Sequence, residues 1–184
     1  MLTTRLATTQ DQVEEAKNFR FKYMCEWNNY YPFTKVEQIR DEFDSHTDYL
    51  VCKSLSEEVV GVVRLIKPSK HGFFLEKFVN LDAYNIDRDN TIEFSECIVN
   101  PNFRGNKKIV MSLIVSSFNY LKENGYRSGI SVSIQSMARF FEKIGFTNTG
   151  ESAICGWQKE VTLMIMNNPE ETEKKLSKYS KLLS

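Results

Sequence analysis

The stretch Glu93-Phe94-Ser95-Glu96-Cys97-Ile98-Val99-Asn100-Pro101-Asn102-Phe103-Arg104-Gly105 decides the fold. It lies in a β-rich run over 91–99 that predicts a strand carrying two carboxylates, and Pro101 predicts the end of strand pairing because it has no N–H. An Arg-Gly turn then leads into the strongest helix pattern of the chain, 106–124. The unpaired N–H groups and the dipole at a helix start stabilise an anion, phosphate above all. We therefore expect this span to hold a phosphorylated cofactor and to place a carboxylate beside its reactive end.

Apolar periodicity predicts the other elements around this stretch. Helices are expected at 11–27, 106–124 and 136–144, with a charged C-terminal helix that opens at Pro169. Strands are expected at 49–53, 59–66, 91–99, 127–134 and 161–167. Residues 55–58 predict a hairpin turn, whereas 28–48 and 68–90 predict long irregular segments, the first with room for one short helix. The order helix, strands, helix, strand, helix, strand predicts a mixed α/β fold layered on one sheet.

Composition limits the class of protein. A chain of 184 residues with 41% hydrophobic residues predicts one globular domain over 1–184, and a net charge of zero argues against a nucleic-acid partner. No apolar run is long enough for a membrane span, and Met1–Arg5 shows no signal peptide, so we expect a cytoplasmic protein. Four scattered cysteines predict reduced thiols, and the isolated His46 and His71 predict no metal site.

Two motifs resemble the GNAT superfamily of acyltransferases. Val99-x-Pro101-x-Phe103-Arg104-Gly105 looks like the family's fourth strand and pyrophosphate loop, and Phe141–Phe146 looks like its aromatic-x-x-x-Gly-Phe segment. The resemblance implies a three-layer α/β/α fold whose central mixed sheet splays open after Val99. It also implies no permanently bound cofactor but an acyl-phosphopantetheine donor as co-substrate, either acyl carrier protein or acyl-CoA. The donor-binding residues would be Ile98, Val99, Arg104, Gly105, Asn106, Lys107 and Lys108.

The chain departs from the GNAT pattern at three positions. Lys107 and Ile109 stand where the family has small residues, which let the backbone approach a pyrophosphate closely. Side chains there are expected to crowd the second phosphate and the nucleotide of coenzyme A. Phe141 stands at the position of the tyrosine that usually protonates the departing thiolate, and phenylalanine has no proton to donate.

The N-terminal half resembles a narrower branch, the acyl-homoserine-lactone synthases and the related N-acyl amino acid synthases. The matching residues are Arg20, Trp27, Asp41-Glu42-Phe43-Asp44, Tyr49-Leu50, Gly61-Val62-Val63-Arg64-Leu65, Phe78 and Glu93-x-Ser95. This branch takes long acyl chains from acyl carrier protein, whose pantetheine ends in one phosphodiester. Ile39 and Glu96 replace a glutamate and an arginine of the lactone synthases. Those changes weaken S-adenosylmethionine as co-substrate and favour an amino acid or another small amine.

The resemblance implies roles for two sets of residues. Glu93, Ser95 and Glu96 would form the catalytic centre, with Glu93 or Glu96 as a base and no covalent step, because no histidine lies near Ser95 or Cys97. Strand alternation puts the two glutamates on opposite faces unless a bulge intervenes. The acceptor would be bound by Arg20, Trp27, Asp41, Asp44, Arg64 and Phe141.

Structural interpretations stand beside these roles. Either glutamate fits a carboxylate paired with Arg20 or Arg64, and a buried Arg64 needs Asp41 or Asp44 as its partner. The two aspartates also fit helix caps, and Lys107 and Lys108 fit a solvated face or a docking surface for an acidic carrier.

The sequence thus predicts an N-acyltransferase that moves an acyl group, long in chain, from a pantetheine thioester to the amine of an amino acid or related small molecule. Backbone N–H groups near 97–99 would polarise the thioester carbonyl for direct attack by the amine. Two alternatives are an acetyl-CoA-dependent N-acetyltransferase and a non-catalytic acyl-binding module of the same fold.

Overall fold

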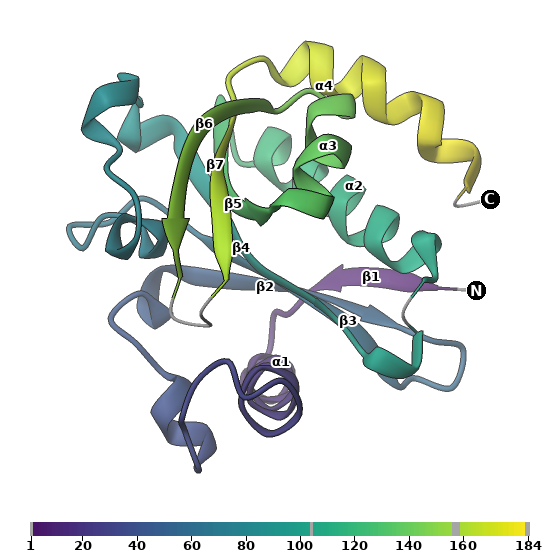
Figure 1. Cartoon of the computed structure of the whole chain (residues 1–184). Coiled ribbons are helices and arrows are strands. Elements are labelled where there is room, and N and C mark those ends of the chain that lie inside the picture. Colours follow the sequence, from purple (N-terminus) through teal and green to yellow (C-terminus); the bar gives the residue numbers. More distant parts are fainter. Residues whose placement is uncertain (1, 104, 156–158, 183–184) are drawn as a thin grey trace.

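Figure 1 shows the computed structural model, which describes residues 2–103, 105–155 and 159–182, with side chains as far as residue 179. A seven-stranded sheet forms its centre. The strands are β1 (Thr3–Leu6), β2 (Thr47–Lys53), β3 (Val59–Ile66), β4 (Thr91–Val99), β5 (Ser128–Ile134), β6 (Thr147–Ile154) and β7 (Glu160–Met166). The α-helices are α1 (Gln10–Phe21), α2 (Lys107–Glu123), α3 (Gln135–Lys143) and α4 (Pro169–Leu176).

The sheet is mixed and opens in its middle. Its order is β1-β2-β3-β4-β5-β7-β6, and every neighbouring pair is antiparallel except β4 and β5. The parallel pairing joins only Thr91–Glu93 to Ser128–Ile130. One step further, the Ser131 hydroxyl donates to the Phe94 carbonyl at 2.8 Å. In Figure 1, β5 and β7 then rise away from β4, which stays with β3.

The predicted splay is therefore present, but its predicted position after Val99 is wrong. Pairing between β4 and β5 ends at Glu93, six residues earlier. A bulge in β4 contributes. One residue of β3 lies between Val62 and Arg64, whereas two residues of β4 lie between their partners Ile98 and Ser95. A bulge bends its strand and increases the local twist, which turns the end of β4 away from β5.

Helices cover both faces of the sheet. Helix α2 packs on β1 to β4, and α3 and α4 complete that layer, whereas α1 packs on the opposite face (Figure 1). The segment with short 3-10 helices at Phe74–Lys77 and Asp82–Tyr84 continues the α1 layer over β5 and β7. The β3 sequence Val-Val-Gly-Val-Val-Arg-Leu-Ile is apolar at nearly every position because both of its faces are buried.

Most predicted elements are confirmed within two residues, with four differences. The predicted helix 11–27 is α-helical only to Phe21 and continues as a π-helical segment, Lys22–Trp27. The segment 28–48 holds two short 3-10 helices, Val36–Ile39 and Asp44–His46, instead of one. The edge strands β1 and β6 were not predicted.

Candidate active site

A cavity of about 350 Å³ lies at the splay between β4 and β5. Its walls come from β4 between Phe94 and Val99, from β5 between Ser131 and Ile134, and from the inner face of α2. Its polar lining includes Asn28, Tyr30, Tyr31, Ser95 and Glu96, of which Tyr30 and Tyr31 pack with the α1 side of the core. Its apolar lining includes residues that all belong to the core on the α2 side, so the polar and apolar ends lie toward opposite faces of the sheet: Leu113, Phe118, Ile144, Phe146, Met166 and Leu176. A long apolar chain with a polar reacting end matches these walls in polarity.

Glu93 is buried beside this cavity but does not line it. The side chain is 1% exposed, and Glu93 Oε2 accepts a hydrogen bond from the Leu75 N–H at 3.2 Å. Burial raises the pKa of Glu93 to about 7, against the smaller opposing effects of the Leu75 N–H, Arg64 and the Ser95 hydroxyl. Ser95 interacts with Glu93 and also lines the cavity, so it connects the buried carboxylate to the cavity.

Glu96 lines the cavity and is held by two arginines. Its φ of 48° places it at the bulge, which lets both glutamates act on the α1 side of the sheet, against simple strand alternation. Glu96 Oε2 lies 2.5 Å from Arg20 Nη2 and 3.8 Å from Arg64 Nη1. Tyr31 donates its hydroxyl hydrogen to Glu96 Oε1 at 3.3 Å. The predicted structural pairing of Glu96 is thus confirmed.

Arg64 is fully buried and is bound by the two predicted aspartates. Arg64 Nη1 donates to Asp41 Oδ2 at 2.8 Å and Nη2 donates to Asp41 Oδ1 at 2.5 Å, whereas Asp44 Oδ1 lies at 3.4 Å. Asp44 also pairs with Lys17 at 2.9 Å. Burial alone lowers the pKa of Arg64, but Glu96 and Asp41 raise it by more, so the guanidinium stays charged.

These side chains form one network with balanced charge. Arg20, whose Nη1 donates to the Tyr49 hydroxyl at 2.8 Å, links through Glu96 to the Arg64 group. The three cations are Lys17, Arg20 and Arg64, and the three anions are Glu96, Asp41 and Asp44. Such buried ion pairs hold their partners in fixed positions, and removal of one partner leaves an uncompensated charge.

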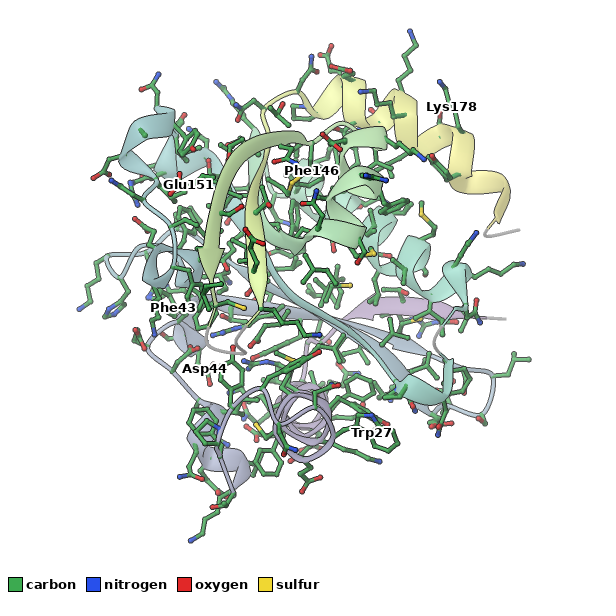
Figure 2. The ribbon with its side chains drawn as sticks, viewed as in Figure 1. Trp27, Phe43, Asp44, Phe146, Glu151 and Lys178 are labelled. Atoms are coloured by element: carbon green, nitrogen blue, oxygen red, sulfur yellow. The ribbon has the colours of Figure 1, made fainter. Side chains whose placement is uncertain are left out.

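Two predicted acceptor-binding residues lie apart from this network. Trp27 is 57% exposed and lies outside the cavity, beside α1 at the bottom of Figure 2. Phe141 lines the apolar part of the cavity and packs edge to face against Phe146, with ring centroids 5.2 Å apart. Phe141 therefore lies among the apolar residues of the cavity and apart from the charge network.

The predicted donor loop is divided by the structure. Ile98 and Val99 line the cavity, and Arg104 lies outside the described residues. Gly105, Asn106, Lys107 and Lys108 are exposed at the start of α2, where the Asn106 side chain caps the helix by accepting from the Lys108 N–H at 3.1 Å. This arrangement leaves helix N–H groups at the surface near the Val99 end of the cavity.

The expectation that Ile109 crowds the donor is wrong. Ile109 is fully buried and packs against Gly61 of β3, where an added Cβ would lie 3.0 Å from Ile109 Cγ2. Its side chain points into the sheet because Gly61 leaves room for it. Only Lys107 of the two replacements presents its side chain to solvent at the loop.

Tyr31 lines the cavity, and its position in the aromatic run 30–33 of a long segment is a sequence signal for such a wall. Sequence reasoning missed two serines of the cavity. Ser131 and Ser133 are buried hydroxyls on β5 that line the cavity. Alternating serines in an otherwise apolar strand were the signal for them. Cys97 also lines the cavity and is exposed.

Among the described residues, no group of three or more His, Cys, Asp or Glu side chains is arranged to hold a metal ion. Within the same residues, no helix has the length and apolar character required to cross a membrane.

The comparisons agree with this architecture. Residues 19–114, which are 96 of the 184 residues, match the family described as "Acetyltransferase (GNAT) domain". The chain belongs to this family. Its GNAT region contains every member of the charge network except Lys17, together with the first turns of α2. No curated protein matches the sequence.

Solved structures share the GNAT-like fold over nearly the whole chain. TofI, in a ternary complex with an inhibitor and MTA, has a TM-score of 0.73 at 18% identity, over 95% of this chain and 96% of TofI. BjaI, a CoA-dependent acyl-homoserine lactone synthase with SAM and isopentyl-CoA, has 0.72 at 17%, over 98% and 89%. FeeM, an N-acyl amino acid synthase from uncultured soil microbes, has 0.71 at 14%, over 97% and 98%. At these identities the likeness establishes the fold.

Proposed function

We propose that this GNAT domain transfers a long acyl chain from the pantetheine thioester of an acyl carrier protein or coenzyme A to the amine of an amino acid or related small molecule. The observation that carries the proposal is the cavity in the splay, apolar at one end and polar at the other. The apolar end would take the acyl chain, since each buried methylene contributes about 0.8 kcal/mol. The polar end would take the acceptor.

The reaction would proceed by direct attack. The amine nitrogen forms a bond to the thioester carbonyl carbon while the carbon–sulfur bond breaks, and the pantetheine sulfur leaves as a thiolate that then takes a proton from solvent. The proton lost by the amine would move toward Glu93 through the Ser95 hydroxyl, because Ser95 interacts with that carboxylate and lines the cavity. A pKa of about 7 keeps Glu93 ready to accept a proton near neutral pH. Phe141 supplies no acid, and a thiolate leaves without one.

The donor remains a choice between two thioesters. Lys107 and Lys108 on the exposed start of α2 favour an acidic carrier protein, and such steering weakens as salt rises. The buried position of Ile109 favours the second candidate, an acyl-CoA donor, because that side chain leaves the loop open.

A comparison of donors tests the proposal. Thiol or carrier release is measured with dodecanoyl and acetyl thioesters of carrier protein and of coenzyme A at equal concentrations, with a mixture of primary amines. We expect the dodecanoyl donors to exceed the acetyl donors at least tenfold in kcat/KM. Efficient turnover of acetyl-CoA alone would establish an ordinary acetyltransferase, and release from none of the donors would establish a non-catalytic module.

The basic residues have a matched test of their own. We expect Arg104→Ala combined with Lys108→Ala to raise the apparent KM for dodecanoyl carrier protein more at 20 mM salt than at 500 mM, because screening removes the contribution of surface charges. The KM for dodecanoyl-CoA serves as the comparison. An equal rise at both salt concentrations would exclude long-range steering by these residues.

A further inference from the structure

The cavity has an aromatic wall on the α1 side of the sheet. Phe74 and Phe78 both line the cavity, and they lie at the start and just past the end of the short 3-10 helix Phe74–Lys77. Their rings meet edge to face, with centroids 5.4 Å apart. This segment is not one of the strands, so side-chain contacts and caps hold it in place rather than a ladder of backbone hydrogen bonds.

The start of this short helix takes its cap from outside the segment. The first N–H groups of a helix have no partner within it, and the residue at the cap position is Phe73, whose side chain has no acceptor atom. Glu76 of the same segment accepts from the Phe73 N–H at 2.7 Å. The acceptor for the N–H groups that follow comes from the neighbouring strand β4.

Glu93 supplies that acceptor. Glu93 Oε2 accepts from the Leu75 N–H at 3.2 Å, and the N–H groups of Leu75 and Phe74 both oppose the rise in the pKa of Glu93. The contact is enclosed, since Glu93 is 1% exposed and Leu75 is fully buried. A carboxylate that accepts from backbone N–H groups at a helix start makes one of the stronger hydrogen bonds of a protein. Glu93 therefore fixes the backbone that carries the Phe74 ring.

The other polar contact of the wall lies at the surface. Lys77 Nζ pairs with Glu42 Oε1 at 2.9 Å and lies over the Phe74 ring, 5.2 Å from its centroid. The two charged side chains are 43% and 44% exposed, and ion pairs with that exposure contribute little. The buried bond to Glu93 is therefore the stronger anchor of the wall.

We propose that Glu93 is a positioning residue of the acceptor site in addition to the candidate base: its carboxylate caps the helix Phe74–Lys77 and holds the Phe74 and Phe78 rings where they contact the acceptor. The proposal rests on the proposed function for the assignment of this side of the cavity to the acceptor. The positioning role depends on the reach of the side chain, whereas the role of a base depends on its charge.

Three substitutions separate reach from charge. Glu93→Gln keeps the length and one acceptor oxygen but no base, Glu93→Asp keeps the carboxylate on a chain one methylene shorter, and Glu93→Ala removes both. We expect the acceptor KM to stay within about twofold of wild type in Glu93→Gln. It should rise about tenfold in Glu93→Asp and Glu93→Ala, because loss of a charged hydrogen bond changes an equilibrium by about that factor. The kcat should follow the opposite order, with Glu93→Asp above Glu93→Gln.

Steady-state kinetics measures this split. Phenethylamine, tyrosine, leucine and glycine are tested as acceptors with the fastest of the four thioester donors described above, and the fastest acceptor is then used for every variant. The donor KM is measured in parallel. We expect it to stay unchanged, because the wall lies on the α1 side of the sheet and the candidate donor loop lies at the start of α2.

Amide exchange gives a second readout that needs no substrate. We expect deuterium uptake at Phe74 and Leu75 to be about tenfold faster in Glu93→Asp and Glu93→Ala than in wild type and Glu93→Gln. Ser128→Ala is the control for general loss of stability, because it removes a buried hydrogen bond to Thr91 on the same pair of strands and leaves the wall unchanged. It should lower the urea midpoint without a change in the acceptor KM. Where Glu93→Ala does not fold, Glu93→Asp and Glu93→Gln decide.

The outcomes separate this role from the proposed function. Equal acceptor KM values in Glu93→Gln and Glu93→Asp, or uptake at Leu75 that is the same in all variants, would overturn the proposal. A donor KM that rises as much as the acceptor KM would also overturn it. Full kcat in Glu93→Gln would refute the base and leave the positioning role standing. Thiol release from none of the donors would refute the acyltransferase, and the exchange rates would still decide whether Glu93 holds the wall.

Discussion

At the level of single residues, the buried Arg64 guanidinium is held by two aspartates of unequal weight. Asp41 receives two hydrogen bonds, whereas Asp44 receives one long contact and shares its charge with Lys17. The two aspartates belong to one short segment of the chain and have similar side-chain exposure, 16% and 15%. They therefore form a natural matched pair for a test of the network.

We expect Asp41→Asn to destabilise the fold more than Asp44→Asn. Loss of the bidentate partner leaves Arg64 buried with reduced compensation, which costs about 3 kcal/mol, and loss of Asp44 costs about 1 kcal/mol. The measurement is the free energy of unfolding by urea for the two variants and the wild type. Equal losses would mean that the contacts of Arg64 contribute little to stability.

Glu93 is a buried carboxylate outside the charge network, and this position leads to a prediction for turnover. Glu93→Gln keeps the shape of the side chain and the acceptor oxygen for the Leu75 N–H but removes the base, so we expect kcat to fall about a hundredfold with native circular dichroism. Ser95→Ala should lower kcat in the same direction if the hydroxyl relays the proton. Unchanged turnover of Glu93→Gln at saturating substrate would exclude the base.

The raised pKa of Glu93 also makes stability depend on pH. In the folded chain the pKa of Glu93 is about 7, against an ordinary pKa of 4.5, so the folded state binds this proton more tightly. Its contribution to stability is therefore complete below pH 4.5 and is lost as pH rises through 7. The full difference is on the order of 3 kcal/mol. Relative to wild type, Glu93→Gln should therefore gain stability between pH 5 and pH 8 in urea unfolding. A difference between the two proteins that is constant with pH would refute the shift.

At the level of elements, Gly61 determines how closely α2 approaches the sheet. A Cβ at this position would lie 2.9 Å from Leu113 Cδ1 and 3.0 Å from Ile109 Cγ2, both on α2. The absence of a side chain in β3 thus lets two large apolar residues of α2 reach the sheet. The same helix carries the candidate donor loop at its start.

We expect Gly61→Ala to push α2 outward and to destabilise the fold by about 1–3 kcal/mol through overpacking. The donor KM should rise as well, because the loop before α2 moves with the helix. Val59→Ala, on the same strand but without such a contact to α2, is the comparison for folding. Stability and KM equal to wild type would show that the core absorbs the methyl group by relaxation.

The sequence predicted the elements that are rich in apolar residues and missed those that are not. β3 is a nearly continuous apolar run because both of its faces are buried, and β4 and α2 carry apolar residues at strand and helical spacing. The edge strands β1 and β6 are polar and mostly exposed, so their pairing leaves little trace in composition. The bulge at Glu96 and the π-helical end of the first helix depend on tertiary packing, which local patterns do not encode.

At the level of the whole molecule, the network and the cavity bring together segments that are far apart in sequence. Pairing of Arg64 with Asp41 or Asp44 was predictable because a buried guanidinium requires a carboxylate. The face of the sheet on which Glu93 and Glu96 lie was not predictable, because it depends on the bulge at Glu96. The resemblance to the synthases implied that Trp27 binds the acceptor, yet that side chain is 57% exposed.

The cavity predicts a limit on acyl chain length. Ser117 lines it from α2, and its hydroxyl donates to the Leu113 carbonyl at 2.8 Å. That carbonyl also accepts the backbone hydrogen bond of the helix, so replacement of Ser117 does not leave it unpaired. We expect Ser117→Leu to lower kcat/KM for dodecanoyl donors at least tenfold and to spare butyryl donors. Ser116→Leu, one position along and outside the cavity lining, is the control. Equal effects of both variants on all chain lengths would contradict this placement of the acyl chain.

The three-residue pairing of β4 with β5 has a consequence for motion on the timescale of amide exchange. It is the hydrogen-bonded seam between two antiparallel halves, β1 to β4 and β5 to β7, so the halves form natural units of partial opening. A molecule bound in the cavity contacts both halves and would hold them together across the β4–β5 pairing. We expect a bound acyl donor to slow deuterium uptake at Ile92–Phe94 and Gly129–Ser131 more than at β2, whose neighbours lie within one half. Breathing of the sheet along this line would then be the motion by which a long chain enters and leaves.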